Sequence, residues 1–187
     1  MTQNGAVMAG DYLSVVQITD THLFSQQHAE LCGVCTDESL QAVLVSLGRS
    51  QQRPDLILLT GDLVHDESRA GYLRLVALLR HLEIPIYCIP GNHDDPFLMK
   101  QVFATSNISL NDVIVKDYWD VFLLNTYTSG QVGGKLQNEC YTKLAERLKV
   151  SGSKHVMVCL HHHPIPIGCK WLDPLGLEEP QRLLSLI

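Results

Sequence analysis

Residue types that bind divalent metals follow four short apolar segments of the chain. The segments are rich in Val, Ile and Leu, which is typical of buried parallel strands, and they cover residues 15–19, 56–60, 86–90 and 156–160. The residues that follow them are Asp20, His22, Asp62, Asn92, His93 and His161. Because ligands bind beyond the carboxyl ends of strands in open α/β sheets, neighbouring strands would bring these side chains into one crevice. Oxygen and imidazole donors together suit Mn, Fe, Zn or Co, so the sequence predicts a metal-dependent hydrolase.

The motifs differ in how strongly each one, taken alone, predicts a metal site. Asp20-x-His22 puts a carboxylate and an imidazole on one side of an extended segment, although a surface turn explains this pair equally well. Gly61-Asp62 is also what an ordinary turn contains. The run at residues 91–94, Gly-Asn-His-Asp, is more specific, because an amide oxygen can bind a metal while the adjacent His handles a proton.

Three consecutive histidines follow the last apolar segment. Alternate residues of an extended segment point to opposite faces, so the three side chains cannot share one function. We expect His161 to face the crevice, and His162 and His163 to have structural roles. Four further histidines are expected at the surface: His28, His65, His81 and His155.

Amphipathic segments of helical period alternate with the apolar segments. They lie at residues 40–47, 72–82, 96–103 and 136–150, and another helix begins near residue 178. Thr36-Asp37 is the expected N-cap of the first helix, and Pro96 lies in the first turn of the third. Residues 113–115 and 121–125 are expected to pair as a hairpin. This alternation predicts one α/β domain over residues 1–187 with a mainly parallel sheet.

Composition narrows the class of protein. A chain of 187 residues with 45% hydrophobic and 18% charged residues is typical of one globular domain. The net charge of −6 and the lack of any Lys/Arg run argue against a nucleic acid polymer as partner. Residues 1–11 have no basic or apolar region of a secretory signal, and no segment is long enough to cross a bilayer, so we expect no membrane association and a cytoplasmic location. The single C-x-x-C at residues 32–35 lacks a second Cys pair, so a structural zinc is not expected there.

Taken together, the motifs resemble those of the calcineurin-like metallophosphoesterase superfamily, whose pattern is D-x-H, G-D, G-N-H-[DE], H and G-H-x-H. Residues 18–24, 160–166 and 168–173 are also similar to bacterial class III cyclic-AMP phosphodiesterases of the CpdA type. The resemblance implies a layered α/β/β/α sandwich. It also implies hydrolysis of 3′,5′-cyclic AMP to 5′-AMP by in-line attack of a metal-activated hydroxide.

The resemblance further implies a centre with two divalent ions, Fe or Mn first, with Zn, Co or Mg as alternatives. It assigns Asp20 and His22 to one ion and Asn92 and His161 to the other, with Asp62 bridging the pair. Three protein ligands for each ion are enough for a catalytic metal.

The same resemblance implies that His93 is the catalytic residue, which stabilises the transition state or protonates the leaving 3′-oxygen. The residues implied to contact the substrate phosphate are His22, Asp62, Asn92 and His93. Asp94 is expected to orient His93. Trp171 is expected either to face the nucleotide base or to lie in the core.

The fifth motif, G-H-x-H, does not occur in residues 1–187. From this we expect a truncated chain with an incomplete second sheet, impaired activity, and exposed strand edges that allow a homo-oligomer. Two alternatives to a cyclic-AMP phosphodiesterase remain. One is a phosphodiesterase or phosphatase that acts on other nucleotides or on glycerophosphodiesters, and the other is a non-catalytic metal- or nucleotide-binding protein.

Overall fold

A four-stranded parallel sheet holds the first three of the four predicted strands. The computed structural model describes residues 12–152 and 154–187, so the expectation that residues 1–11 carry no secretory signal lies outside the described residues. The strands of this sheet, called the parallel sheet below, are β1 (Val15–Ile18), β4 (Leu56–Leu59), β5 (Ile86–Cys88) and β6 (Ile108–Ser109). They pair in the order β1-β4-β5-β6, so the ends of β1, β4 and β5 lie side by side.

A second sheet of three strands, called the mixed sheet below, holds the fourth predicted strand. Its strands are β7 (Val113–Val115), β8 (Trp119–Leu123) and β9 (His155–Cys159). The predicted hairpin is confirmed, because β7 pairs with β8 in antiparallel orientation. The parallel strand expected at residues 156–160 is confirmed as β9, which pairs in parallel with β8. Its expected burial is wrong: β8 is its only partner among the described strands, and its side chains are half-buried or exposed.

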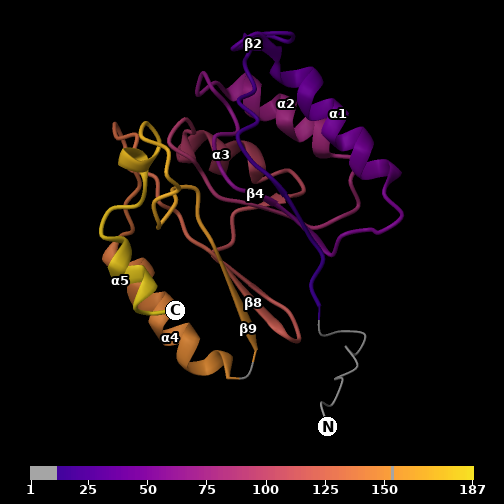
Figure 1. Ribbon diagram of the computed structural model, residues 1–187. Helices are drawn as coiled ribbons and strands as arrows, with labels where there is room; N and C mark the ends of the chain where they lie inside the picture. Colours follow the sequence, from indigo (N-terminus) through magenta and orange to yellow (C-terminus); the bar gives the residue numbers. More distant parts are fainter. Residues whose placement is uncertain (1–11, 153) are drawn as a thin grey trace.

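In residues 12–152 and 154–187, five α-helices connect or cover the sheets. They are α1 (Thr36–Arg49), α2 (Arg69–Leu79), α3 (Pro96–Phe103), α4 (Asn138–Ser151) and α5 (Pro180–Leu184). A hairpin of β2 (Glu30–Leu31) and β3 (Val34–Cys35) precedes α1, and a 3-10 turn spans Asp173–Leu175. Figure 1 shows α1, α2 and α3 at one end of the molecule and α4 with α5 toward the other. In the part of the chain that the structure describes, no helix has the length and apolar character to cross a membrane.

Side chains cap the starts of helices α2 and α3. Asp95 caps α3, since its carboxylate accepts hydrogen bonds from the amides of Phe97 and Leu98, and Pro96 occupies the first turn as predicted. Ser68 caps α2 by accepting a hydrogen bond from the amide of Gly71. The expectation for α1 is wrong, because Thr36 is already helical and the cap position belongs to Cys35, which makes no side-chain cap. Cys35 is the last residue of β3, which pairs with β2 directly before α1.

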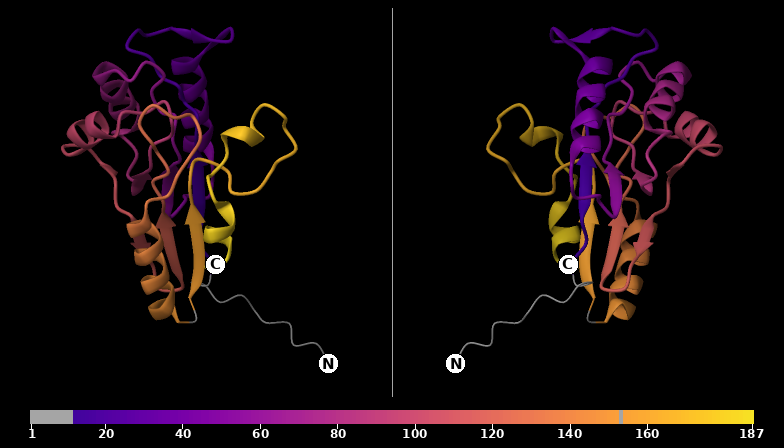
Figure 2. Two further views of the ribbon diagram at one scale, coloured as in Figure 1. Left: turned by 90° about the vertical axis from the view of Figure 1, so that its left-hand side faces the viewer. Right: turned by 90° about the vertical axis from the view of Figure 1, so that its right-hand side faces the viewer.

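Three apolar layers give the expected α/β/β/α arrangement. Along β4, Ile57 and Leu59 pack against helices α1 to α3, whereas Leu56 and Leu58 pack against Val121 and neighbouring residues of the mixed sheet. This alternation is the two-residue period of a strand that is buried on both faces. The other face of the mixed sheet is covered by α4, as Figure 2 shows for β8 and β9 at the end opposite α1. The layered fold class is therefore confirmed.

The buried carboxylate of Asp120, in β8, contacts the C-terminal end of α4 and the residue that precedes β9. Asp120 is fully buried and accepts a hydrogen bond of 2.6 Å from the Ser151 hydroxyl and one of 3.3 Å from the Lys154 ammonium. The Arg147 guanidinium lies 3.3 Å away. Burial alone would raise the pKa of Asp120, but these hydrogen bonds and positive charges lower it overall.

We expect Asp120→Asn to lower the free energy of unfolding by about 1–3 kcal/mol at neutral pH, since it removes a charged hydrogen-bond acceptor. Because the folded-state pKa lies below the unfolded value, this stabilisation is present above the unfolded pKa and is lost as the pH falls through the folded one. Urea unfolding at neutral pH and at about pH 3.5 measures the difference. Asp117→Asn, at an exposed carboxylate between β7 and β8, is the control. An equal loss at both pH values would contradict the role of the charge.

Candidate metal centre

The chain segments beyond β1 and β4 stay paired after the strands end. The amide of Asp20 donates to the carbonyl of Gly61 at 3.0 Å, and the amide of His22 donates to the carbonyl of Asp62 at 2.9 Å. Asp20, His22 and Asp62 all have positive φ, at 54°, 41° and 53°. Non-glycine residues seldom adopt this region, and such strain is concentrated at functional sites. The pairing brings the first two predicted motifs into contact.

The Asp62 carboxylate lies between two imidazoles. Its Oδ2 atom is 3.8 Å from Nε2 of His22, and its Oδ1 atom is 3.4 Å from Nε2 of His161. The Nε2 atom of His22 is also 3.9 Å from Oδ1 of Asp20. One carboxylate oxygen thus faces each imidazole, which is the arrangement that a carboxylate needs in order to bridge two metal ions. The three atoms of Asp20, His22 and Asp62 can reach a common ion.

Both imidazoles have their Nδ1 atoms engaged elsewhere. Nδ1 of His161 lies 2.8 Å from the Thr60 carbonyl oxygen, to which it can only donate. Nδ1 of His22 lies 3.2 Å from Nδ1 of His65. In each ring Nε2 is therefore the atom that faces the carboxylates. Histidine ligands in metal sites commonly use their second nitrogen in this way, to fix the ring and its tautomer.

Burial and neighbouring charges shift the pKa values of Asp62, His161 and His22. Burial alone would raise the pKa of Asp62, but the His161 ring and the amide of His93 lower it overall, so the carboxylate is ionised at neutral pH. Burial alone would lower the pKa of His161, and the Asp62 carboxylate raises it overall. For His22, burial outweighs Asp62 and the pKa is lowered. Asp62 is therefore a negatively charged group that can neutralise the positive charge of a bound ion.

Two glycines allow the segments to approach this closely. A Cβ atom on Gly91 would collide with Oδ1 of Asp62 and lie 2.8 Å from Nε2 of His161. A Cβ atom on Gly61, which has φ of 101°, would lie 2.6 Å from the amide nitrogen of Gly91. Any side chain at Gly91 would therefore fill the space in which an ion would contact Asp62 and His161.

Asp94 ties the segments after β4 and β5 together. Its fully buried carboxylate accepts hydrogen bonds from the amides of Leu63, Val64 and Gly91 at 2.9–3.2 Å, and from the Tyr72 hydroxyl at 3.0 Å. The expectation that Asp94 orients the His93 ring is wrong, because among the described residues its partners are these four groups. Asp94 instead holds the backbone segment that carries His93, through its hydrogen bond from the Gly91 amide.

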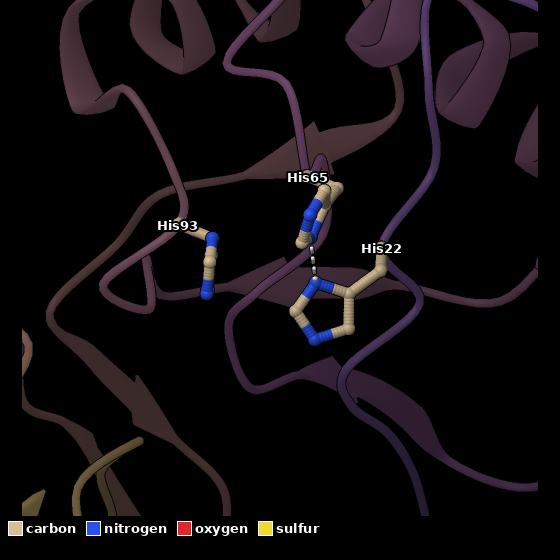
Figure 3. Close-up of side chains that lie close together, drawn as sticks. All are labelled: His22, His65 and His93. Carbon is tan, nitrogen blue, oxygen red and sulfur yellow. Dashed lines mark hydrogen bonds between the residues drawn. The ribbon is translucent and has the colours of Figure 1, made fainter. Parts of the chain in front are cut away.

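His65 belongs to the centre, contrary to the expectation that it lies at the surface. Its ring is half-buried and stacks on that of His93, with centroids 4.8 Å apart and planes inclined by 20°. Figure 3 shows the rings of His22, His65 and His93 grouped together. The sequence carries no periodic signal for His65, since it lies in the irregular segment after β4. Its position three residues after Asp62 was the only available indication.

The other predicted histidine roles can also be compared with the structure. His162 is structural as predicted: it is buried and lies 2.7 Å from the Thr126 hydroxyl and 2.9 Å from the Val132 carbonyl oxygen. His163 is half-buried, with Nε2 at 3.8 Å from Oδ1 of Asp173. The remaining three are exposed as predicted: His28, His81 and His155.

A cavity of about 370 Å³ unites the predicted site. It is lined by all six predicted residues, namely Asp20, His22, Asp62, Asn92, His93 and His161, and also by His65, His162, His163, Val132 and Trp171. Trp171 is 71% exposed, so the alternative of a core tryptophan is wrong. Outside this cavity, the C-x-x-C cysteines Cys32 and Cys35 are free thiols at the β2–β3 hairpin.

Comparison with known proteins identifies the family. Residues 13–182 match the calcineurin-like phosphoesterase family model, and the chain belongs to this family. It is 37% identical over 173 residues to the 3′,5′-cyclic adenosine monophosphate phosphodiesterase CpdA of Pseudomonas aeruginosa, and 38% identical over 174 residues to that of Escherichia coli K12. Each alignment covers 92% of this chain and 63% of the relative, so the chain spans less than two thirds of their length. A 3′,5′-cyclic-nucleotide phosphodiesterase of Nostoc sp. is 32% identical over 94% of this chain and 66% of its own length.

We expect Tyr72→Phe to lower the free energy of unfolding by about 1–3 kcal/mol, because it leaves Asp94 short of one buried donor. The Tyr72 hydroxyl also accepts a 2.7 Å hydrogen bond from the Asp95 amide, so two interactions are lost. Urea unfolding measures the loss. The control is Tyr141→Phe, a buried tyrosine whose hydroxyl makes no hydrogen bond to the described residues. Equal stability of the two variants would show that the bond to Asp94 contributes little.

Proposed function

We propose that this chain holds two divalent metal ions and hydrolyses 3′,5′-cyclic AMP to 5′-AMP. The observation that supports this most directly is the Asp62 carboxylate, with one oxygen toward Nε2 of His22 and the other toward Nε2 of His161. These two imidazoles follow strands of different sheets, and the Nε2 atom of each faces the Asp62 carboxylate.

The donor set fits hard-to-intermediate divalent ions. Asp20, His22 and Asp62 would hold one ion, and Asp62, Asn92 and His161 the other, which gives each a mixture of oxygen and nitrogen. Iron or manganese is our first choice, with zinc, cobalt or magnesium as alternatives. When bound, such a pair of ions lowers the pKa of water and neutralises phosphoryl charge, which is the chemistry that in-line hydrolysis needs.

The residues around the ions would bind the phosphate and move one proton. His22, Asp62, Asn92 and His93 line the cavity where the phosphate group would lie. A hydroxide, left when water gives one proton to solvent, forms a bond to phosphorus, the bond from phosphorus to the 3′-oxygen breaks, and His93 donates a proton to that oxygen and takes one back from solvent. The amide of His93 donates to Oδ1 of Asp62 at 2.9 Å, which holds the His93 backbone next to the carboxylate.

The substrate assignment is supported by the relatives and by the size of the cavity. The relatives above are named as phosphodiesterases of cyclic AMP or of 3′,5′-cyclic nucleotides. A cavity of about 370 Å³ falls in the range that small-molecule sites occupy. Association through strand edges, expected from the sequence, stays a prediction.

We expect Asp62→Ala to lose at least one bound ion and to lower turnover of cyclic AMP by about 10²-fold or more, because both ions lose a ligand. Metal content per chain and production of 5′-AMP with added Mn²⁺ measure the two effects. Asp117→Ala removes a carboxylate outside the cavity and is the control. Metal binding without turnover in the unchanged chain would contradict the proposed reaction and leave a metal-binding protein. Faster hydrolysis of 2′,3′-cyclic AMP or of a glycerophosphodiester would show that 3′,5′-cyclic AMP is not the preferred substrate.

We expect His93→Ala to lower turnover of cyclic AMP by about 10²–10⁴-fold, as for loss of a general acid. Bis(p-nitrophenyl) phosphate has a leaving group that departs without a proton, so its hydrolysis should fall much less. Comparing kcat for the two substrates at saturating Mn²⁺ tests this role. Equal losses for both substrates would mean that His93 stabilises the transition state in another way.

A further inference from the structure

We propose that His65 is a positioning residue that holds a metal ligand, His22, through a hydrogen bond and the proton donor, His93, through ring stacking. This inference rests on the proposed function, since it assigns these roles to His22 and His93. It adds a residue that lies outside the four motifs and that the sequence placed at the surface. A single imidazole would then connect metal binding with protonation of the leaving group.

The direction of the hydrogen bond between His22 and His65 depends on which of the two Nδ1 atoms carries the proton. Nε2 of His22 lies 3.8 Å and 3.9 Å from the nearest oxygens of Asp62 and Asp20, which is too far for a hydrogen bond. The short contact of this ring is at Nδ1, 3.2 Å from Nδ1 of His65. If Nδ1 of His22 carries the proton and donates to His65, then Nε2 keeps its lone pair for an ion. With this direction, His65 would select the tautomer of His22 that binds metal.

The Nδ1 atoms of His161 and His22 have different kinds of hydrogen-bond partner. Nδ1 of His161 donates to the Thr60 carbonyl oxygen, an acceptor that cannot be replaced by changing a side chain. For His22 the acceptor is a side chain, so it can be removed by mutation. The two proposed metal positions therefore differ in a way that an experiment can address.

Stacking on His93 is the second contact of the His65 ring. The two rings lie nearly parallel, 4.8 Å apart, and Phe24 contacts His65 with a centroid distance of 4.9 Å. The amide of His65 donates to the Leu23 carbonyl at 2.8 Å, which fixes its backbone. Aromatic pairs at such distances prefer defined orientations, so His65 limits the orientations open to the His93 ring.

Two variants separate the two contacts. His65→Phe keeps an aromatic ring beside His93 and removes the acceptor for His22. His65→Asn removes the ring and keeps an acceptor, since its amide oxygen occupies the approximate place of Nδ1. Urea unfolding of both variants measures any general loss of stability.

We expect His65→Phe to weaken Mn²⁺ binding by about 10–100-fold, as is usual when the partner of a ligating histidine is lost. Equilibrium dialysis with Mn²⁺ alone measures this without any activity. His65→Asn should keep Mn²⁺ affinity within about threefold, but at saturating Mn²⁺ its kcat should fall more for cyclic AMP than for bis(p-nitrophenyl) phosphate. Nitrogen-resolved NMR of the metal-free chain should show the proton of His22 on Nδ1, and the loss of that preference in His65→Phe.

The outcomes separate this inference from the proposed function. If the unchanged chain binds Mn²⁺ and hydrolyses cyclic AMP while His65→Phe binds Mn²⁺ equally well and keeps the His22 tautomer, the inference about His65 is overturned alone. Equal losses for both substrates in His65→Asn would overturn the stacking role. If the unchanged chain neither binds Mn²⁺ nor hydrolyses a phosphodiester, the proposed function fails and the role of His65 fails with it.

Discussion

The buried carboxylate of Asp94 is the interaction on which the metal centre depends. It accepts four hydrogen bonds, three from backbone amides after β4 and β5 and one from Tyr72 of α2. Burial raises the pKa of this group, although the hydrogen bonds oppose that effect. Irregular segments normally leave their amides to water, but here a single side chain satisfies them inside the protein. The segments that carry Asp62, His65 and His93 are therefore held rigid without regular secondary structure.

The parts of the fold that local signals determine could be predicted from the sequence. The helix Pro96–Phe103 has the predicted bounds, because a capping Asp, a Pro and an apolar stripe occur together. The start of α1 was misplaced, since Cys35, the last residue of β3, takes the cap position. For residues 155–159 an apolar run identifies a strand, but composition does not reveal how many neighbours that strand has. Depth of burial is a property of the whole fold.

In the candidate site, too, the sequence predicts what local motifs determine and misses what distant contacts determine. All six residues predicted from the motifs line one cavity: the order of strands β1-β4-β5 brings five of them together, and packing of the mixed sheet against the parallel sheet adds His161. Their roles as ligands stay predictions. His65 was misassigned because its position depends on pairing between Leu23 and Val64, 41 residues apart in sequence, which no local pattern encodes. For Asp94 the motif indicates a residue of the site, but its buried partners include the amides of Leu63 and Val64 and the Tyr72 hydroxyl, which come from distant segments that no local pattern identifies.

The origin of the two imidazoles around Asp62 has a mechanical consequence. His22 and Asp62 follow strands of the parallel sheet, whereas His161 follows a strand of the mixed sheet. The spacing between Asp62 and His161 therefore depends on the hydrogen bond of the His161 ring to the Thr60 carbonyl and on the apolar layer in which Leu58 and Val121 pack between the sheets. A change in side-chain volume in that layer would shift one sheet against the other and change the distance between Asp62 and the His161 ring. Packing between the two sheets thus contributes to the geometry of a site whose side chains follow strands of both sheets.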